Sequence, residues 1–211
     1  MNNKSYTMVE LLITITITLI LMMVVFNFFN LSKLVYSYGL AGQMLQDGDN
    51  IVINKIIGGK TEPGGIYRLA QSASYCIGTQ SGATSTCSTQ FSPTCNTTTT
   101  GELHFCGYPD YIERSVRLDA TATQLIYHHP VSPSNNNNCS VVFYNASSYN
   151  VCDEVVYTAP KGATITLRFW IPAVANYPAA VVGIDAALIQ SVFGRSVTGS
   201  STTIVNLRNH P

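Results

Sequence analysis

An acidic residue at the edge of an apolar segment is the first feature of the sequence with chemical meaning. Glu10 precedes an uncharged run that extends from Leu11 to Ser32. A carboxylate at membrane depth is costly and rare, so an acid in this position indicates a function that uses its charge. The alternative is that Glu10 only faces lipid headgroups at the membrane interface. The residue types alone leave both interpretations open.

Six cysteines form the second group of reactive side chains. No Cys-x-x-Cys pair occurs among them, so neither a zinc ribbon nor a thioredoxin-like site is expected. An even number at loose spacings outside the apolar segment instead predicts disulfides in an exported domain. The six are Cys76, Cys87, Cys95, Cys106, Cys139 and Cys152.

The positions of these cysteines predict one pair and leave the others open. We expect Cys139 to bond to Cys152, because both flank one hairpin or short excursion of the chain. The remaining four pair either as a nested set, with Cys87–Cys95 inside Cys76–Cys106, or in chain order.

The other side chains match no known catalytic or metal-binding pattern. Adjacent residues of a strand point to opposite faces, so His128 and His129 cannot chelate one metal ion, and we expect both at the surface. Residues 194–199 miss the GxSxG spacing of a serine hydrolase, and no HExxH, P-loop or GxGxxG pattern occurs. Residues 47–50 lack the ligand spacing of a calcium loop and predict a solvated helix face. We therefore predict no catalytic residue, no metal and no cofactor.

Length and composition limit the class of protein. A chain of 211 residues with one terminal apolar segment has room for one domain outside the membrane. Only 10% of the residues are charged and the formal net charge is zero, so no basic surface for nucleic acid is predicted.

The apolar segment itself must be a helix. Residues 13–18 alternate between isoleucine and threonine as a strand would, but a single strand cannot satisfy its backbone in lipid. In a helix, the threonine hydroxyls can bond to carbonyls of the preceding turn. The run from Leu11 to Ser32 spans about 33 Å as a helix, enough to cross a bilayer. It is too long for an ordinary secretory signal and lacks a small-residue cleavage site, so a plain transmembrane anchor is the simplest alternative.

The residues around Glu10 carry a resemblance that goes further. Ser5-Tyr6-Thr7-Met8-Val9-Glu10-Leu11-Leu12 resembles the prepilin motif of type IV pilins and type II secretion pseudopilins. In that family a leader ending in Gly is followed by Phe-Thr-Leu-Ile/Val-Glu-Leu-Leu. Ser5 takes the last leader position, Tyr6 the first mature one, and Glu10 matches the family's acid. Ser5 in place of Gly and Tyr6 in place of Phe are the two departures.

The resemblance implies a processing route, a set of partners and a location. Prepilin peptidase would cut between Ser5 and Tyr6 and methylate the new amine, which Glu10 of a neighbouring subunit could then meet in a filament. The implied partners are other pilin or pseudopilin subunits, prepilin peptidase, the inner-membrane assembly platform and membrane lipid. The implied location is the cytoplasmic membrane, crossed once, with the C-terminal domain outside the cytoplasm and in the pilus or pseudopilus after assembly.

The remaining pattern predicts an α+β, pilin-like fold. One helix is expected from Tyr6 to Ile57, stopped at Gly58-Gly59, with an apolar stripe that includes Leu45, Val52 and Ile56. A Thr/Ser/Gly-rich loop insertion at 79–101 and an antiparallel sheet follow. The expected strands are Glu102–Cys106, Tyr111–Leu118, Gln124–His128, Cys139–Tyr144, Glu154–Thr158, Thr164–Ile171, Val182–Gln190 and Thr203–Leu207.

These expectations combine into a leader at 1–5, a transmembrane or filament-core helix half at 6–32, and an extracytoplasmic domain at 33–211. The stretch 65–70 and the terminal Leu207-Arg208-Asn209 resemble minor pseudopilins, so the expected function is that of a minor pilin or pseudopilin. The alternatives are a major pilin, or a membrane-anchored binding protein or enzyme.

Overall fold

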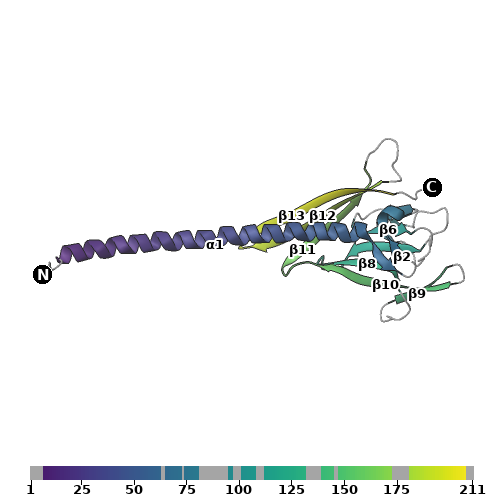
Figure 1. Ribbon diagram of the computed structural model, residues 1–211, viewed down its shortest axis with the longest axis horizontal. Coiled ribbons are helices and arrows are strands. Elements are labelled where there is room, and N and C mark those ends of the chain that lie inside the picture. Colours follow the sequence, from purple (N-terminus) through teal and green to yellow (C-terminus); the bar gives the residue numbers. More distant parts are fainter. Residues whose placement is uncertain are drawn as a thin grey trace. The chain divides into compact units, whose positions relative to one another are not determined.

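The computed structural model describes residues 7–62, 65–72, 74–80, 95–96, 101–107, 112–131, 139–144, 147–172 and 181–207 (Figure 1). The chain divides into two compact units, Met1–Ala41 and Gly42–Pro211. One helix, α1 (Met8–Gly58), contributes residues to both units. The expected boundaries at residues 5 and 32 stay a prediction.

The helical part of the first unit confirms the helix prediction for the Ile-Thr run. The Thr18 hydroxyl donates to the carbonyl oxygen of Thr14 at 2.7 Å, and Thr14 and Thr16 bond four residues back in the same way. Each threonine thereby satisfies its hydroxyl inside the helix, as a threonine in lipid must.

The helix ends where the sequence predicts and begins two residues later than predicted. Its last residue is Gly58, and Gly59 has a φ of 68°, the left-handed conformation that terminates many helices and that glycine adopts at little cost. At the other end the helix begins at Met8 rather than Tyr6, because Thr7 acts as the N-cap residue.

A six-stranded antiparallel sheet forms one wall of the second unit. Its strand order is β3-β6-β7-β8-β10-β9. The strands are β3 (Ser74–Ile77), β6 (Leu103–Cys106), β7 (Glu113–Leu118), β8 (Gln124–Val131), β9 (Cys139–Tyr144) and β10 (Ser147–Thr158). Smaller elements precede and flank it: the hairpin of β1 (Lys60–Glu62) and β2 (Gly65–Tyr67), the 3₁₀ turn η1 (Leu69–Gln71), and the pair β4 (Thr79–Gln80) and β5 (Cys95–Asn96).

A three-stranded antiparallel sheet forms the other wall. It consists of β11 (Ala163–Trp170), β12 (Val181–Val192) and β13 (Arg195–Asn206) in that order. Side chains along β11 alternate between buried and exposed, with Ile165, Leu167 and Phe169 inward. This period of two is typical of a sheet with one wet face.

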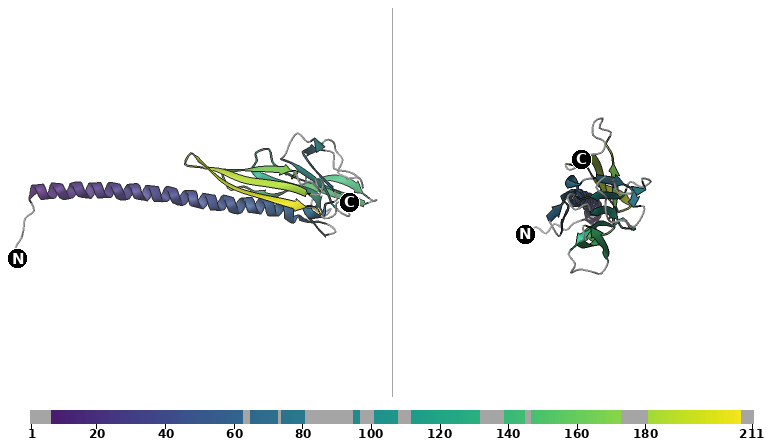
Figure 2. Two further views of the ribbon diagram at one scale, coloured as in Figure 1. Left: turned by 90° about the horizontal axis from the view of Figure 1, so that it is seen from above. Right: turned by 90° about the vertical axis from the view of Figure 1, so that its right-hand side faces the viewer.

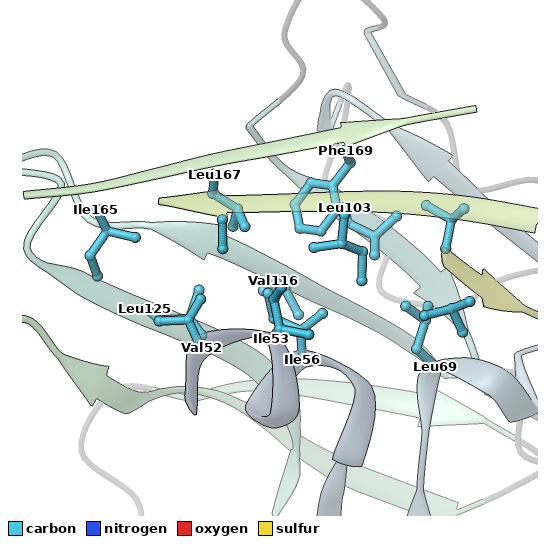
Figure 3. Packing of buried hydrophobic residues seen from close by; sticks show 14 of the residues in the cluster. Val52, Ile53, Ile56, Leu69, Leu103, Val116, Leu125, Ile165, Leu167 and Phe169 are labelled. Atoms are coloured by element: carbon cyan, nitrogen blue, oxygen red, sulfur yellow. The ribbon is translucent and has the colours of Figure 1, made fainter. Parts of the chain in front are cut away.

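The core lies between the two larger sheets and the second part of α1. Leu45, Val52 and Ile56 on the helix are fully buried, as the helical spacing predicts. Figure 3 shows Val52, Ile53 and Ile56 close to Leu103, Val116 and Leu125 of the larger sheet and to Ile165, Leu167 and Phe169 of the smaller one. These residues belong to one hydrophobic cluster, which confirms the α+β class with a long N-terminal helix on antiparallel sheet.

Several strands differ in extent from their predictions. Strand β13 begins at Arg195, eight residues before the predicted start at Thr203. Strand β8 continues past His128 to Val131, and β10 begins at Ser147 rather than Glu154. Two sheets, rather than one, cover the helix. Most of the 79–101 insertion, including Cys87, and the expected turn at 135–138 lie outside the described residues.

Candidate processing and assembly site

Glu10 occupies the third position of α1 and takes part in the N-terminal cap. Its backbone N–H donates to the Thr7 carbonyl at 3.0 Å and lies 3.3 Å from the Thr7 hydroxyl oxygen. Thr-x-x-Glu is the sequence of a capping box, in which the fourth residue is favoured as Glu or Gln. The acid also lies where the helix dipole favours negative charge. The sequence interpretation missed this second role, although the spacing of Thr7 and Glu10 indicates it.

The helix behind Glu10 exposes an apolar surface on all sides. Within the first unit no described residue is buried between Met8 and Tyr36, and the most apolar window of the helix has a mean hydropathy of 2.6. The helix is thus long and apolar enough to cross a membrane. At the end of the uncharged run, the Lys33 ammonium lies 5.0 Å from the centre of the Phe29 ring, a cation–π distance.

Comparison with known families decides what this N-terminus is. Residues 1–26 match the family described as the prokaryotic N-terminal methylation motif. The chain carries the prepilin signal. This motif covers Glu10 and the first part of the apolar helix, as the resemblance predicts. Ser5 and Tyr6, the predicted cleavage and methylation residues, lie outside the described residues, so their roles stay predictions. Comparison with curated proteins and with solved structures finds no significant match.

The positions and the bonding state of the described cysteines agree with disulfide formation in the second unit. Cys76, Cys106 and Cys152 are disulfide-bonded. Cys152 of β10 is the direct register partner of Cys139 in β9. Cys76 and Cys106 lie on neighbouring strands β3 and β6, two positions out of register and therefore on the same face. The full pairing scheme stays a prediction.

A buried histidine on the larger sheet is held by two carboxylates. His104 is 2% exposed, with Nδ1 2.8 Å from Glu113 Oε1 and Nε2 3.2 Å from Glu102 Oε1. Burial alone would lower the pKa of His104, but the hydrogen bonds and charges of Glu102 and Glu113 outweigh it and raise the pKa to about 9. The imidazole is therefore a buried cation at neutral pH, paired on both sides. Among the described residues, no group of three His, Cys, Asp or Glu is placed to hold a metal ion.

The adjacent histidines are not both at the surface, which corrects the expectation for His129. His129 is 2% exposed, with Nε2 2.9 Å from Glu154 Oε2 and its ring 5.3 Å from that of Tyr127. The expectation failed because β8 continues past Pro130, so alternate positions of the strand reach the core. His128 points the other way and pairs with Asp153, Nδ1 to Oδ1 2.8 Å.

Strand register places Ser115, His128 and Asp153 in one row across β7, β8 and β10. A serine, a histidine and an aspartate in this spatial order are the residue types of a hydrolytic triad. Ser115 is only 3% exposed, however, and Arg117 binds the Asp153 carboxylate at 2.6 Å. A nucleophile without access to substrate and an acid neutralised by a guanidinium indicate a structural network.

The predicted solvated face at 47–50 is also wrong at two residues, because Gly48 and Asp49 are both buried. Asp49 is fully buried, and neither of its carboxylate oxygens has a hydrogen-bond partner among the described residues. Burial, and to a smaller degree the charge of Asp47, raises the pKa of the Asp49 carboxyl. Asp49 lies four residues after Leu45 and three before Val52, so the helical period already places it on the buried stripe. The acidic composition of the segment obscured that signal.

An open hollow lies on the outer face of the smaller sheet and bears on the binding-protein alternative. It measures about 320 Å³ and its polar lining comprises Thr166, Arg168, Asp185, Ser200, Ser201 and Thr202. Arg168 and Asp185 are register partners. The described residues that line the hollow include neither histidine nor cysteine.

Proposed function

We propose that the chain is a structural subunit, a minor pilin or pseudopilin of a type IV pilus or a type II secretion pseudopilus. The observation that carries the proposal is a single helix that begins inside the N-terminal methylation motif and ends in the core of an α+β domain. One half of that helix has an exposed apolar surface suited to lipid or to other helices, and the other half packs on sheets.

The assembly role belongs to Glu10. If processing frees an amine on Tyr6, each subunit carries an ammonium and a carboxylate four residues apart in the sequence. In a filament core, where water is excluded, the carboxylate is stabilised only when a neighbour's amine meets it. A misaligned subunit leaves a buried charge unpaired, so the pair sets the register between subunits.

The location follows from the same elements. The apolar half of α1 crosses the cytoplasmic membrane once, and the second unit lies outside the cytoplasm, next to the assembly platform. The disulfide-bonded state of Cys76, Cys106 and Cys152 supports an oxidising compartment. The stretch 65–70 and the terminal Leu207-Arg208-Asn209 support the minor class, in which the exposed domain specifies partner contacts.

Intact-mass measurement of the protein from its native membrane tests the proposal. We expect the loss of residues 1–5, so that the chain begins at Tyr6, together with the mass of one methyl group on the new amine. The same chain from cells without prepilin peptidase is the control and should keep its N-terminus. A chain that retains residues 1–5 in the presence of the peptidase contradicts the proposal.

A further inference from the structure

Two amide side chains interrupt the apolar surface of α1 in the first unit. The helix is unbroken through this unit from Met8 onward (Figure 2). Asn27 and Asn30 lie within the uncharged run that ends at Ser32, and both side chains are exposed. An amide exposed to lipid tails has no water to bond to, so it needs a hydrogen-bond partner from protein.

Asn27 is the deeper of the two amides. The middle of the uncharged run lies between Leu21 and Met22. Along a helix, this point is about 8 Å from Asn27 and about 13 Å from Asn30. Half the hydrocarbon thickness of a bilayer is about 15 Å. When the run spans a membrane, Asn27 therefore lies inside the hydrocarbon, whereas Asn30 lies near its edge, where water and headgroups can bond to it.

The helix itself does not bind the Asn27 amide. The Thr18 hydroxyl donates to the Thr14 carbonyl at 2.7 Å. Farther along the helix, the Asn50 amide likewise donates to the Gln46 carbonyl at 2.9 Å. Asn27 makes neither this bond nor any other hydrogen bond with a described residue. Its donors and its acceptor are therefore available to another chain.

Asn27 belongs to a row of residues with the spacing of a coiled-coil seam. Steps of three and four residues, which connect a and d positions, join seven exposed side chains of the first unit. This Asn27 seam consists of Ile13, Thr16, Ile20, Met23, Asn27, Asn30 and Leu34. Ile13, Ile20 and Asn27 occupy a positions, where isoleucine favours two parallel strands and a single asparagine fixes their register.

A second copy of this chain has the chemistry that matches the seam. Two copies inserted in the same direction are parallel, so their Asn27 side chains lie at the same depth. Each amide has N–H donors and a carbonyl acceptor, so two amides related by a two-fold axis can exchange two hydrogen bonds. Lipid tails offer neither a donor nor an acceptor, so the amide favours the pair over the separate helices.

We propose that two copies of the chain form a parallel pair in the membrane along the Asn27 seam, with reciprocal hydrogen bonds between their Asn27 amides. Asparagine side chains bond across membrane helices in this way. The contact is independent of Glu10 and of the processed N-terminus, so the pair forms before assembly. The inference rests on the proposed membrane anchoring of the subunit.

Photocrosslinking of the full chain tests the pair. The photoreactive p-benzoyl-phenylalanine replaces Met23 on the seam or Val25 on the opposite face of the helix. These positions lie at a similar depth and are 71% and 64% exposed, so Val25 is the matched control. Two differently tagged copies are expressed together in phosphate-labelled cells that lack other prepilin-type subunits. After irradiation, each adduct is identified as phospholipid, second copy or other protein.

We expect adducts that carry both tags at position 23, several-fold above position 25, and phospholipid adducts at position 25. Asn27→Leu should lower the two-tag yield at 23 several-fold, whereas Asn27→Gln keeps an amide and should retain part of it. Thr18→Leu is the control variant, because Thr18 lies on the opposite face and its hydroxyl is bonded inside the helix. It should leave the yield unchanged.

The other outcomes separate the pair from the anchoring. Equal two-tag yields at 23 and 25 overturn the pair, as does a yield at 23 that Asn27→Leu fails to lower or that Thr18→Leu lowers as much. Phospholipid adducts at 25 then leave the anchored subunit intact. Adducts from 23 to a different polypeptide overturn the second copy as the partner. Absence of phospholipid adducts at both positions overturns the anchoring as well.

Discussion

Glu10 contributes to α1 through its backbone and, in the proposed filament, through its charge. The backbone N–H bonds to Thr7, and a Gln at this position of a capping box serves the helix equally well. Glu10→Gln therefore removes the charge and keeps the cap. Variants at this position can separate helix formation from assembly.

We predict that Glu10→Gln leaves the membrane level of the subunit unchanged and reduces its recruitment into filaments. A lone subunit can solvate this carboxylate at the interface, so insertion does not depend on it. Glu10→Lys should assemble less than Glu10→Gln, because it sets like charges against the neighbour's amine. Fractionation of sheared filaments measures both variants. Incorporation of Glu10→Lys at the wild-type level would show that the acid does not set register.

Asp49 is a second acid of the same helix, and we expect its burial to lower the stability of the fold. Burial removes the hydration of this carboxylate, and the nearby Ser201 side chain and Asn50 backbone offset the loss only in part. We predict that Asp49→Asn raises the free energy of unfolding at pH 7 by about 1 kcal/mol. Asp47→Asn, at an exposed position of the same turn, is the control and should change it little. Thermal unfolding of the full chain in detergent measures both, and a lower melting temperature for Asp49→Asn would contradict the prediction.

The raised pKa of Asp49 gives that measurement a pH dependence. Between the ordinary value of 3.8 and the raised folded-state value, the folded chain binds more protons than the unfolded chain. The free energy of unfolding of the wild type therefore falls as the pH rises through this window, because the folded chain must give up a proton that the unfolded chain has already lost. The difference in stability between Asp49→Asn and wild type should grow over the same interval.

At the scale of elements, the contact between α1 and β13 depends on glycine. A Cβ on Gly199 would lie 2.6 to 2.7 Å from backbone atoms of Leu45 and Gln46, which cannot rotate away. We predict that Gly199→Ala lowers the free energy of unfolding by about 1–3 kcal/mol, because the strand must move off the helix. Gly39→Ala is the control, since nothing lies within 4 Å of its added Cβ and alanine favours the helix. An unchanged melting temperature for Gly199→Ala would show that the two elements are not in tight contact.

The same contact shows where sequence reasoning succeeds and where it fails. The extent of α1 and its buried stripe follow from apolar spacing and a terminal glycine pair, which are local signals. Strand β13 was underestimated because Ser196 to Thr202 carry few apolar side chains, and their strand conformation comes from pairing with β12. The buried positions of Asp49 and His129 depend on partners distant in the sequence. For Asp49 the helical period gives a local signal of burial, which the acidic composition of the segment obscured, whereas for His129 no local pattern specifies the partner.

At the scale of the whole molecule, disulfides are expected to supplement a core closed by two sheets and one helix. The Cα atoms of directly opposed antiparallel residues lie within the range that a disulfide bridges, and Cys139 and Cys152 are such a pair. We predict that peptide mapping of the unreduced protein finds Cys139–Cys152 and no free thiol among the six cysteines. Closing a loop of this size stabilises by about 3 kcal/mol, so Cys152→Ser should lower the melting temperature by several degrees. A mapped bond between Cys152 and any other cysteine would contradict the pairing.

The approach of Gly199 to Leu45 also has a consequence for the time at which the domain can fold. Gly199 is synthesised 154 residues after Leu45 (199 − 45), so the helix is made well before the strand that packs on it. At 5–20 residues per second, roughly 8–30 s pass between the synthesis of the two. During that interval the second half of α1 lacks its β13 partner, and its buried stripe is exposed to chaperones, oxidants and proteases. The packing of α1 is therefore completed only after β13 has been synthesised and exported, so the domain cannot finish folding before that strand is available.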